Sequence, residues 1–320
     1  MSTKPLILAP LQGLTEVLYR RTYEQCFPGA FDRAVAPFIS LTHGNLADAW
    51  KKIGDVLPDN NRGSIPVTPQ ILGKEPDEFI ALANRMGEVL SKDRGCTTEQ
   101  VEVNWNIGCP MRKVAGKHRG SGILPYPDEV RRVLDAVVPQ LQVGLSIKIR
   151  LGHNSPDEIF NLIPILNDYP LVGVTIHPRT GKQQYGGSVD IERFAQAYGL
   201  LKAPVTYNGD ICSVADYRRI VGRFPNIRAV MIGRGVLYDP LLPWKIKENI
   251  HDDPQKAIVF LESLIENILA RPLSDEGKMR KIKEYWCLCW HSLPITEQQS
   301  RELLHQPSLQ LTVENFHHLK

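Results

Sequence analysis

Short apolar runs recur along the chain, and most of them are followed by a segment with the spacing of an amphipathic helix. The intervening segments include PDEFIALANRMGEVLS and YPDEVRRVLDAVVPQL, whose apolar residues recur at every third or fourth position. Eight runs have the length of a strand and are bounded by turn residues: 6–10, 34–40, 64–72, 100–106, 144–151, 172–178, 203–209 and 229–235. This alternation predicts an α/β fold, specifically a (β/α)8 TIM barrel. A doubly wound sheet would normally carry a glycine-rich dinucleotide motif after an early strand, and the sequence has none.

The strand pattern stops at about residue 242. The segments LLPWKIKENI, PQKAIVFLESLIENILARPL, EGKMRKIKEYWCLCWHSL and TEQQSRELLHQ all have helical periodicity, and Pro, Gly and acidic residues separate them. We therefore expect a catalytic barrel at 1–242, followed by a small all-helical domain at 243–320. A unit of that size buries little surface alone, so we expect it to pack against the barrel.

Polar residues stand where the predicted strands end. Six of the eight runs end this way, and the eighth ends in the sequence Gly-Arg-Gly. In a barrel of parallel strands these ends meet at one mouth, where active sites of this fold are built. The sequence therefore predicts an active site made from Gln12, Gln70, Asn106, Cys109, Lys148, Arg150, His177, Arg179, Asn208, Asp210, Gly233, Arg234 and Gly235.

Composition narrows the class of protein but does not identify a function. Hydrophobic residues make up 42% of the chain and charged residues 23%, which is ordinary for a soluble globular protein. The apolar runs are shorter than the ~20 residues of a membrane span, and the N-terminal run is too short for a secretory signal. We expect a cytoplasmic protein without a membrane partner. The six cysteines lack paired CxxC spacing, so we expect no metal site and no disulfide framework. A net charge of +3 says almost nothing about nucleic acid.

The ends of the last two strands have the chemistry of a phosphate site. NGD (208–210) and GRG (233–235) offer glycines, main-chain N–H groups and a guanidinium. The simpler alternative is that these glycines only make tight turns. Lys148 can stabilise negative charge on the ring of a cofactor that accepts a hydride.

Cys109 and His177 are the candidates for proton chemistry. A thiol is mostly protonated at neutral pH and can act as an acid, whereas neighbouring cations would favour a nucleophilic thiolate. A small buried hydrophobic residue is the third alternative for Cys109. His177 is either a core histidine or a hydrogen-bond donor to a substrate carbonyl. The sequence alone leaves these alternatives open.

The motifs resemble those of the tRNA-dihydrouridine synthases. NxGCP (106–110) and GSGIL (120–124) are similar to the active-site signature of that family. The resemblance extends over about residues 5 to 240 and occurs in the family's order. It also includes APLQG (9–13), VTPQILG (67–73), SIKIRLG (146–152), VTIHPRT (174–180), VTYNGDI (205–211) and AVMIGRG (229–235).

The resemblance implies an enzyme that carries FMN, takes electrons from NADPH and reduces the C5–C6 double bond of a uridine in tRNA. It implies that Cys109 donates the proton and that Asn106, Arg150 and Arg179 position the uracil. The flavin and its phosphate would contact Pro10, Leu11, Gln12, Gln70, Lys148, His177, Asn208, Gly209, Asp210, Gly233 and Arg234. The stretch KMRKIKEYW is also similar to the C-terminal segment of the subgroup that acts on uridine 16 of the D-loop.

Two basic segments are candidates for RNA contact, because cations suit phosphates and aromatic rings suit unstacked bases. The alternative for both is an ordinary solvated surface. The first segment is a loop with Lys113, Lys117 and Arg119, and the second is a helical stretch with Lys278, Arg280, Lys281 and Lys283. We expect a monomer that binds tRNA.

Three residues depart from the family pattern, namely Asn104, Trp105 and Met111. They bear on the choice of uridine more than on the flavin chemistry. Alternative functions are an FMN ene-reductase for a free small molecule, a family member acting on ribosomal RNA, and a non-catalytic RNA-binding homologue.

Overall fold

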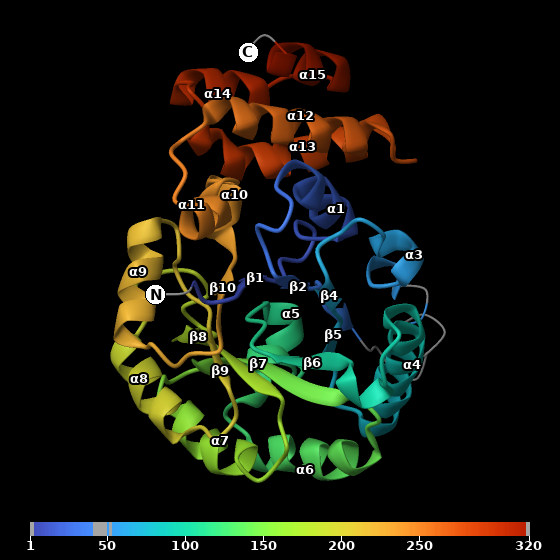
Figure 1. Cartoon of the computed structure of the whole chain (residues 1–320), viewed down its shortest axis with the longest axis vertical. Coiled ribbons are helices and arrows are strands. Elements are labelled where there is room, and N and C mark those ends of the chain that lie inside the picture. Colours follow the sequence, from blue (N-terminus) through green and yellow to red (C-terminus); the bar gives the residue numbers. More distant parts are fainter. Residues whose placement is uncertain (1–2, 41–49, 51–52, 318–320) are drawn as a thin grey trace.

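The strands of this computed structural model form one parallel sheet that curls into a barrel (Figure 1). The structure describes residues 3–40, 50 and 53–317. The strands follow one another around the sheet in the order β3-β5-β6-β7-β8-β9-β10-β1-β2-β4. The barrel closes because β4 (Val67–Thr68) and β5 (Gln70–Leu72) are adjacent pieces of one extended segment. β4 pairs with β2 on one side, and β5 pairs with β6 on the other.

Each predicted run contains strand residues, so the TIM-barrel prediction is confirmed. The remaining strands are β1 (Leu6–Leu8), β2 (Arg33–Val35), β3 (Ile39–Ser40), β6 (Glu102–Ile107), β7 (Gly144–Gly152), β8 (Gly173–Thr180), β9 (Val205–Tyr207) and β10 (Ala229–Ile232). The second and third runs are each divided into two short strands, at Pro37 and Pro69. Proline has no N–H to donate to a sheet, so the ladder is interrupted at both positions.

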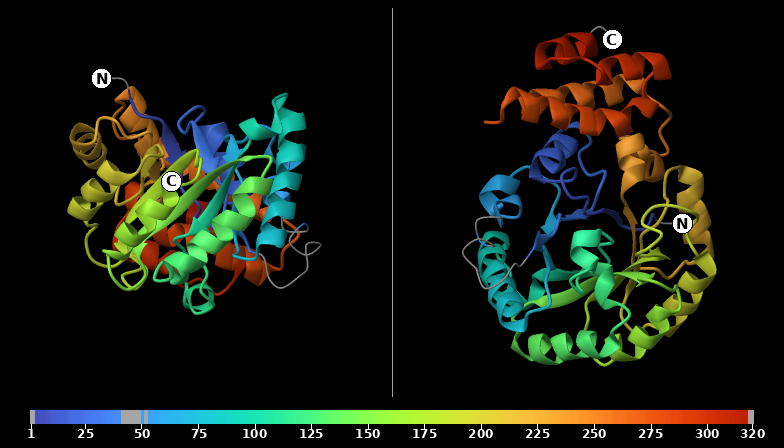
Figure 2. Two further views of the ribbon diagram at one scale, coloured as in Figure 1. Left: turned by 90° about the horizontal axis from the view of Figure 1, so that it is seen from below. Right: turned by 180° about the vertical axis from the view of Figure 1, so that it is seen from behind.

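Helices surround the barrel and cover the outer faces of its strands (Figures 1 and 2). Along the barrel the helices are α1 (Val17–Cys26), α3 (Pro58–Asn61), α4 (Pro76–Arg94), α5 (Arg112–Ala115), α6 (Pro127–Val137), α7 (Glu158–Leu166), α8 (Ile191–Leu200), α9 (Val214–Arg223), α10 (Arg234–Tyr238) and α11 (Leu242–Glu248). Their apolar faces and the outer faces of the strands form one continuous core. No helix among the described residues is long and apolar enough to cross a membrane.

The chain after residue 250 forms a helical layer at one end of the molecule (Figure 1). It contains α12 (Pro254–Leu269), α13 (Asp275–Cys289), α14 (Glu297–Leu304) and α15 (Leu309–His317). Aromatic rings join it to α1: Tyr19 stacks on Tyr285 with a centroid distance of 5.8 Å and meets the edge of Phe260 at 5.6 Å. The Tyr285 hydroxyl donates to the carbonyl of Leu14 at 2.6 Å. Helix α13 therefore contacts the loop between β1 and α1, which reaches the barrel mouth.

Candidate active site

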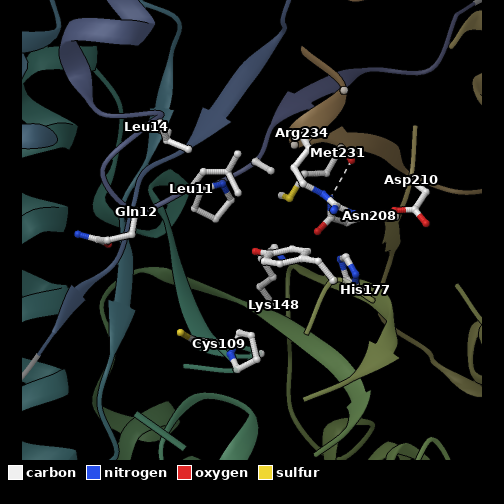
Figure 3. A pocket seen from close by; sticks show the side chains of 18 of the residues that line it. Leu11, Gln12, Leu14, Cys109, Lys148, His177, Asn208, Asp210, Met231 and Arg234 are labelled. Carbon is white, nitrogen blue, oxygen red and sulfur yellow. Dashed lines mark hydrogen bonds and ion pairs between the residues drawn. The ribbon is translucent and has the colours of Figure 1, made fainter. Parts of the chain in front are cut away.

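A cavity of about 390 Å³ opens at the carboxyl ends of the barrel strands (Figure 3). This volume lies in the range of roughly 300–1,000 Å³ that is typical of cofactor and ligand sites. Most of the predicted site residues line the cavity, although they come from separate strands. They are Pro10, Leu11, Gln12, Asn106, Cys109, Lys148, Arg150, His177, Asn208, Gly209, Asp210, Gly233 and Arg234.

Gln70 and Arg179 do not line the cavity and lie behind its wall. Gln70 is fully buried and bonds to the side chains of Asn104 and Asn106. Arg179 is 2% exposed and forms a bidentate ion pair with Asp210, with N–O distances of 2.9 and 2.5 Å. In this arrangement both side chains support residues that face the cavity. Direct contact of either one with a ligand stays a prediction.

Cys109 lies where β6 runs into the next loop, and a neighbouring amide holds its main chain. The side-chain oxygen of Asn106 accepts hydrogen bonds from the N–H groups of Gly108 at 3.0 Å and Cys109 at 2.9 Å. Burial raises the pKa of the Cys109 thiol, although the Met111 N–H and the charges of Arg150 and Lys148 act in the opposite direction. The thiol therefore stays protonated at neutral pH, which favours an acid over a nucleophile.

Two cations come from β7, and they differ in how they are held. Burial and the nearby charge of Arg150 lower the pKa of Lys148 to about 7. The Lys148 ammonium makes no ion pair with any residue that the structure describes. Arg150 instead donates to the carbonyls of Gly108 at 3.0 Å and Thr180 at 2.8 Å. Arg150 thus ties the Cys109 loop to the end of β8, while Lys148 is free to meet a ligand.

His177 is buried on β8, and the surrounding cations keep it neutral. Burial lowers its pKa well below the ordinary value, and Arg150, Lys148 and Arg179 lower it further. A guanidinium nitrogen of Arg179 lies 3.3 Å from Nε2 of His177. Because a guanidinium only donates hydrogen bonds, Nε2 is the acceptor and the proton of the neutral ring is on Nδ1. The neutral ring therefore has one N–H group, and the ring also forms a hydrogen bond with the side chain of Asn208.

The ends of β9 and β10 form a polar corner with two arginines and one carboxylate. Asp210, with a φ of +41°, pairs with Arg234 at 3.0 Å and with Arg179. Because two guanidiniums share one carboxylate, the corner keeps a positive balance. A Cβ on Gly235 would lie 1.9 Å from the carbonyl oxygen of Ile211, so only glycine fits at that position.

These features suit a flavin mononucleotide. An apolar wall that includes Leu11 and Met231 faces Lys148 across the cavity and can accept a flat ring (Figure 3). The polar corner at Asn208–Asp210 and Gly233–Arg234 can accept a phosphate through main-chain N–H groups and a guanidinium. Lys148 supplies the positive charge that an electron-rich ring requires.

Some residues that line the cavity are not among the predicted site residues. They are Leu14, Phe38, Met111, Tyr185 and Leu288, together with Cys212. The Tyr185 ring lies 4.6 Å from the Arg234 guanidinium and 5.5 Å from that of Arg150. Tyr185 lies in the loop sequence QQYGG. Binding residues are often found on loops, so an aromatic residue in this loop is a signal that could have identified Tyr185. Leu288 comes from α13, so the helical layer contributes directly to the cavity.

The candidate RNA-binding cations fall into different environments. Lys113, Lys117 and Arg280 are exposed, Lys278 is half-buried, and Arg119 is half-buried and has an interaction partner. The Lys281 ammonium contacts the carbonyl of Gly13 and lies 3.2 Å from Glu284. Lys283 donates to the carbonyl of Gln306 at 2.8 Å. Lys281 and Lys283 thus have structural contacts, and Lys113, Lys117 and Arg280 are the cations most accessible to a phosphate.

Comparison with known proteins agrees with this geometry. The chain matches the model of the dihydrouridine synthase (Dus) family over residues 7–305. It is 26% identical over 292 residues to a tRNA-dihydrouridine(16) synthase of Neisseria meningitidis serogroup B, covering 88% of this chain and 84% of the relative. A tRNA-dihydrouridine(16) synthase of Vibrio vulnificus is 24% identical over 98% of this chain and 97% of its own length. A tRNA-dihydrouridine synthase B of Pasteurella multocida is 29% identical over 84% of this chain and 76% of its own length. The chain therefore belongs to the dihydrouridine synthase family.

Proposed function

We propose that this protein is a flavin-dependent tRNA-dihydrouridine synthase that uses FMN and NADPH to reduce a D-loop uridine in tRNA. The observation that carries the proposal is the placement of a protonated thiol, an unpaired lysine and a neutral histidine around one cavity. Membership of the family supports the reaction class. The Neisseria and Vibrio relatives are named tRNA-dihydrouridine(16) synthases, which favours uridine 16 as the target.

FMN would lie with its ring between Lys148 and the loop that contains Pro10, Leu11 and Gln12. Asn208, Gly209, Gly233 and Arg234 would hold its phosphate. When bound, the reduced flavin supplies the hydride that adds to C6 of the uracil. We expect NADPH to reach this cavity before RNA does.

Cys109 is the proton donor in this proposal. Addition of a hydride at C6 places negative charge on C5 and on the O4 carbonyl of the uracil. The thiol then donates its proton to C5, which completes the saturated bond and leaves a thiolate. Arg150 and Lys148 stabilise that thiolate until solvent protonates it again.

Fixed hydrogen-bond donors around the cavity stabilise the charge on the uracil oxygens. The Asn106 side chain can donate a hydrogen bond to a carbonyl of the base. The N–H group of His177 would do the same by exchanging its contact with Asn208 for the base. Because these donors are positioned before the substrate arrives, little reorganisation accompanies the reaction. Donors of this kind contribute on the order of 10²–10³ to the rate in other enzymes.

The RNA must present its target base outside the stack, since the reacting atoms lie inside a cavity. Lys113, Lys117, Lys278 and Arg280 would then contact phosphates near the mouth. The remaining parts of the proposal are a division at residue 242 into a catalytic barrel and a tRNA-binding helical domain, a monomeric state, and a cytoplasmic location.

The deciding experiment maps dihydrouridine across all RNAs from a strain that lacks the gene. Loss at position 16 of tRNA and at no other site supports the proposal, and loss in ribosomal RNA contradicts the tRNA assignment. The purified protein should be yellow and should consume NADPH when unmodified tRNA is added. Consumption with free uridine but not with tRNA would indicate a small-molecule reductase, and a colourless protein without turnover would indicate an RNA-binding homologue.

A further inference from the structure

A row of buried side chains joined by hydrogen bonds runs beneath the cavity, across β5, β6 and β7. Asn106 donates from Nδ2 to Oε1 of Gln70 at 2.8 Å. Gln70 donates from Nε2 to Oδ1 of Asn104 at 2.8 Å, and Asn104 donates from Nδ2 to Oγ of Ser146 at 2.8 Å. These contacts follow the register of the sheet, in which Asn104 lies opposite Gln70 on one side and Ser146 on the other. We call these four side chains the amide relay.

The direction of the amide relay is set by the main chain. Oδ1 of Asn106 accepts hydrogen bonds from the N–H groups of Gly108 and Cys109, which can only donate. The Asn106 amide therefore presents its nitrogen to Gln70, and Gln70 must meet it with oxygen. Gln70 in turn presents nitrogen to Asn104, which must meet it with oxygen. The orientation of each amide follows from that of the previous one. Reversal of any one amide would therefore place two donors or two acceptors against each other.

This order has a consequence for the cavity. Asn106 lines the cavity, while its oxygen is occupied by main-chain N–H groups and one of its N–H groups is occupied by Gln70. Its second N–H group is the one left for a ligand. Asn106 therefore offers a hydrogen-bond donor to the cavity. This donor favours a ligand with a carbonyl oxygen at that position over a ligand with an amino group there. The same contacts hold the main chain that carries Cys109.

We propose that Asn104 and Ser146 are positioning residues that fix Asn106 and the Cys109 loop through the amide relay. The inference rests on the proposed function for its catalytic consequence, but the geometry of the relay stands without it. Neither residue lines the cavity, and Asn104 is 2% and Ser146 3% exposed. If they served packing alone, loss of their polar groups would lower stability without changing Asn106 or the Cys109 loop.

Three substitutions separate these alternatives. Asn104→Leu removes the acceptor for Gln70 and keeps the number and branching of the side-chain heavy atoms, so Gln70 and Asn106 lose their fixed orientation. Ser146→Ala removes only the last acceptor of the row and should have a smaller effect. Asn104→Asp keeps an oxygen toward Gln70, and the Ser146 hydroxyl can turn to donate to it, so the direction of the row is retained. Thr206→Val is the matched control, since Thr206 is 4% exposed on β9 and lies outside the relay.

The first readout is hydrogen–deuterium exchange of the main-chain N–H groups of Gly108 and Cys109, which does not depend on activity. We expect faster exchange in Asn104→Leu, by about tenfold, a smaller increase in Ser146→Ala, and near wild-type exchange in Asn104→Asp and Thr206→Val. The second readout separates the half-reactions of the FMN-loaded enzyme. Oxidation of the reduced enzyme by tRNA should slow about tenfold or more in Asn104→Leu, because small misplacements near reacting atoms are costly. Reduction by NADPH should change less than about twofold.

Wild-type exchange and wild-type oxidation by tRNA in Asn104→Leu would overturn the proposal, as would equal losses in Thr206→Val. If Asn104→Leu does not fold, the comparison of Asn104→Asp with Ser146→Ala decides the question. Ser146→Ala should then show faster exchange and slower oxidation by tRNA than Asn104→Asp, and equal values in the two variants would overturn the proposal. If the wild-type enzyme is not oxidised by tRNA, the proposed function fails. The exchange measurement still tests the relay in that case.

Discussion

The two ends of the barrel both gather cations, but only one end pairs all the cations named here with anions. At the end where the strands begin, Arg33 and Arg228 share Glu102 at 2.9 and 3.6 Å, and Lys247 pairs with Asp32 at 3.0 Å. We call these residues the amino-terminal rim. At the mouth, Arg179 and Arg234 likewise share Asp210. Lys148, however, has no anion among the described residues, and Arg150 donates to the carbonyl groups of Gly108, Thr180 and Gln184.

This difference in pairing distinguishes charged residues that stabilise the fold from charged residues that bind a ligand. A buried cation without an anion is unfavourable, because it loses hydration and gains no ion pair in return. Such a group persists where it has a function that offsets its cost to stability. The amino-terminal rim has satisfied its charges within the protein. At the mouth, Lys148 and Arg150 have no such anion, and unpaired cations of this kind are typical of a binding site.

The largest expected effect is at the mouth, in Cys109→Ala. Loss of a general acid slows a reaction by about 10²–10⁴-fold, so product formation from tRNA should fall by that factor. FMN content should stay at the wild-type level, because the thiol is not among the groups proposed to hold the flavin. The measurement is single-turnover formation of dihydrouridine by the pre-reduced enzyme.

Cys212→Ala is the matched control, since Cys212 lines the same cavity and is exposed. It should retain the wild-type rate. The thiol of Cys109 has a raised pKa, so the wild-type rate should hold through neutral pH and fall only as the pH rises above that pKa. A wild-type rate in Cys109→Ala, or equal losses in both variants, would refute the assigned acid.

The next largest effect is expected in Lys148→Met, which should raise the stability of the flavin-free protein and lower its affinity for FMN. The pKa of Lys148 is about 7 in the folded chain and 10.5 ordinarily, so the unfolded chain binds more protons between these values. The stability of the flavin-free wild type should therefore rise with pH across this window. The variant removes the penalty, so its flavin-free form should melt several degrees higher at pH 6.5 and show little difference at pH 10.5.

The same variant should bind FMN about tenfold or more weakly, because a hydrogen bond from a charged group contributes roughly 1.5–3 kcal/mol. Thermal unfolding at both pH values and FMN titration by fluorescence measure the two effects. Lys182→Met, at an exposed position, is the control and should change neither. A variant that is less stable at pH 6.5, or that binds FMN with wild-type affinity, would remove Lys148 from the proposed site.

The sequence predicted the fold and much of the site at the mouth, but not which side chains face the cavity. Alternating apolar runs with polar ends predicted the barrel and brought Cys109, Lys148 and His177 to one mouth, because the ends of parallel strands must meet there. The sequence did not separate residues that face the cavity from those behind them. Gln70 and Arg179 lie in the same motifs as the lining residues, and only side-chain packing places them in the wall. Leu288 and Tyr185 come from a distant helix and a loop, for which strand periodicity holds no information.

The smallest effect is expected at the amino-terminal rim, in Glu102→Gln. The side chains of Arg33, Arg228 and Glu102 are 30%, 32% and 18% exposed, so solvent screens the charges that lose their partner. We expect a loss of about 1 kcal/mol or less in the free energy of unfolding, measured by urea denaturation. The rate of tRNA reduction and the affinity for FMN should stay within about twofold of wild type, because the change lies at the opposite end of the barrel from the cavity. Glu88→Gln, which breaks the more exposed pair with Arg85, is the control and should give a still smaller loss. A large loss of activity in Glu102→Gln at unchanged stability would show that the paired charges at this rim also serve the reaction, and the distinction between the two ends would fail.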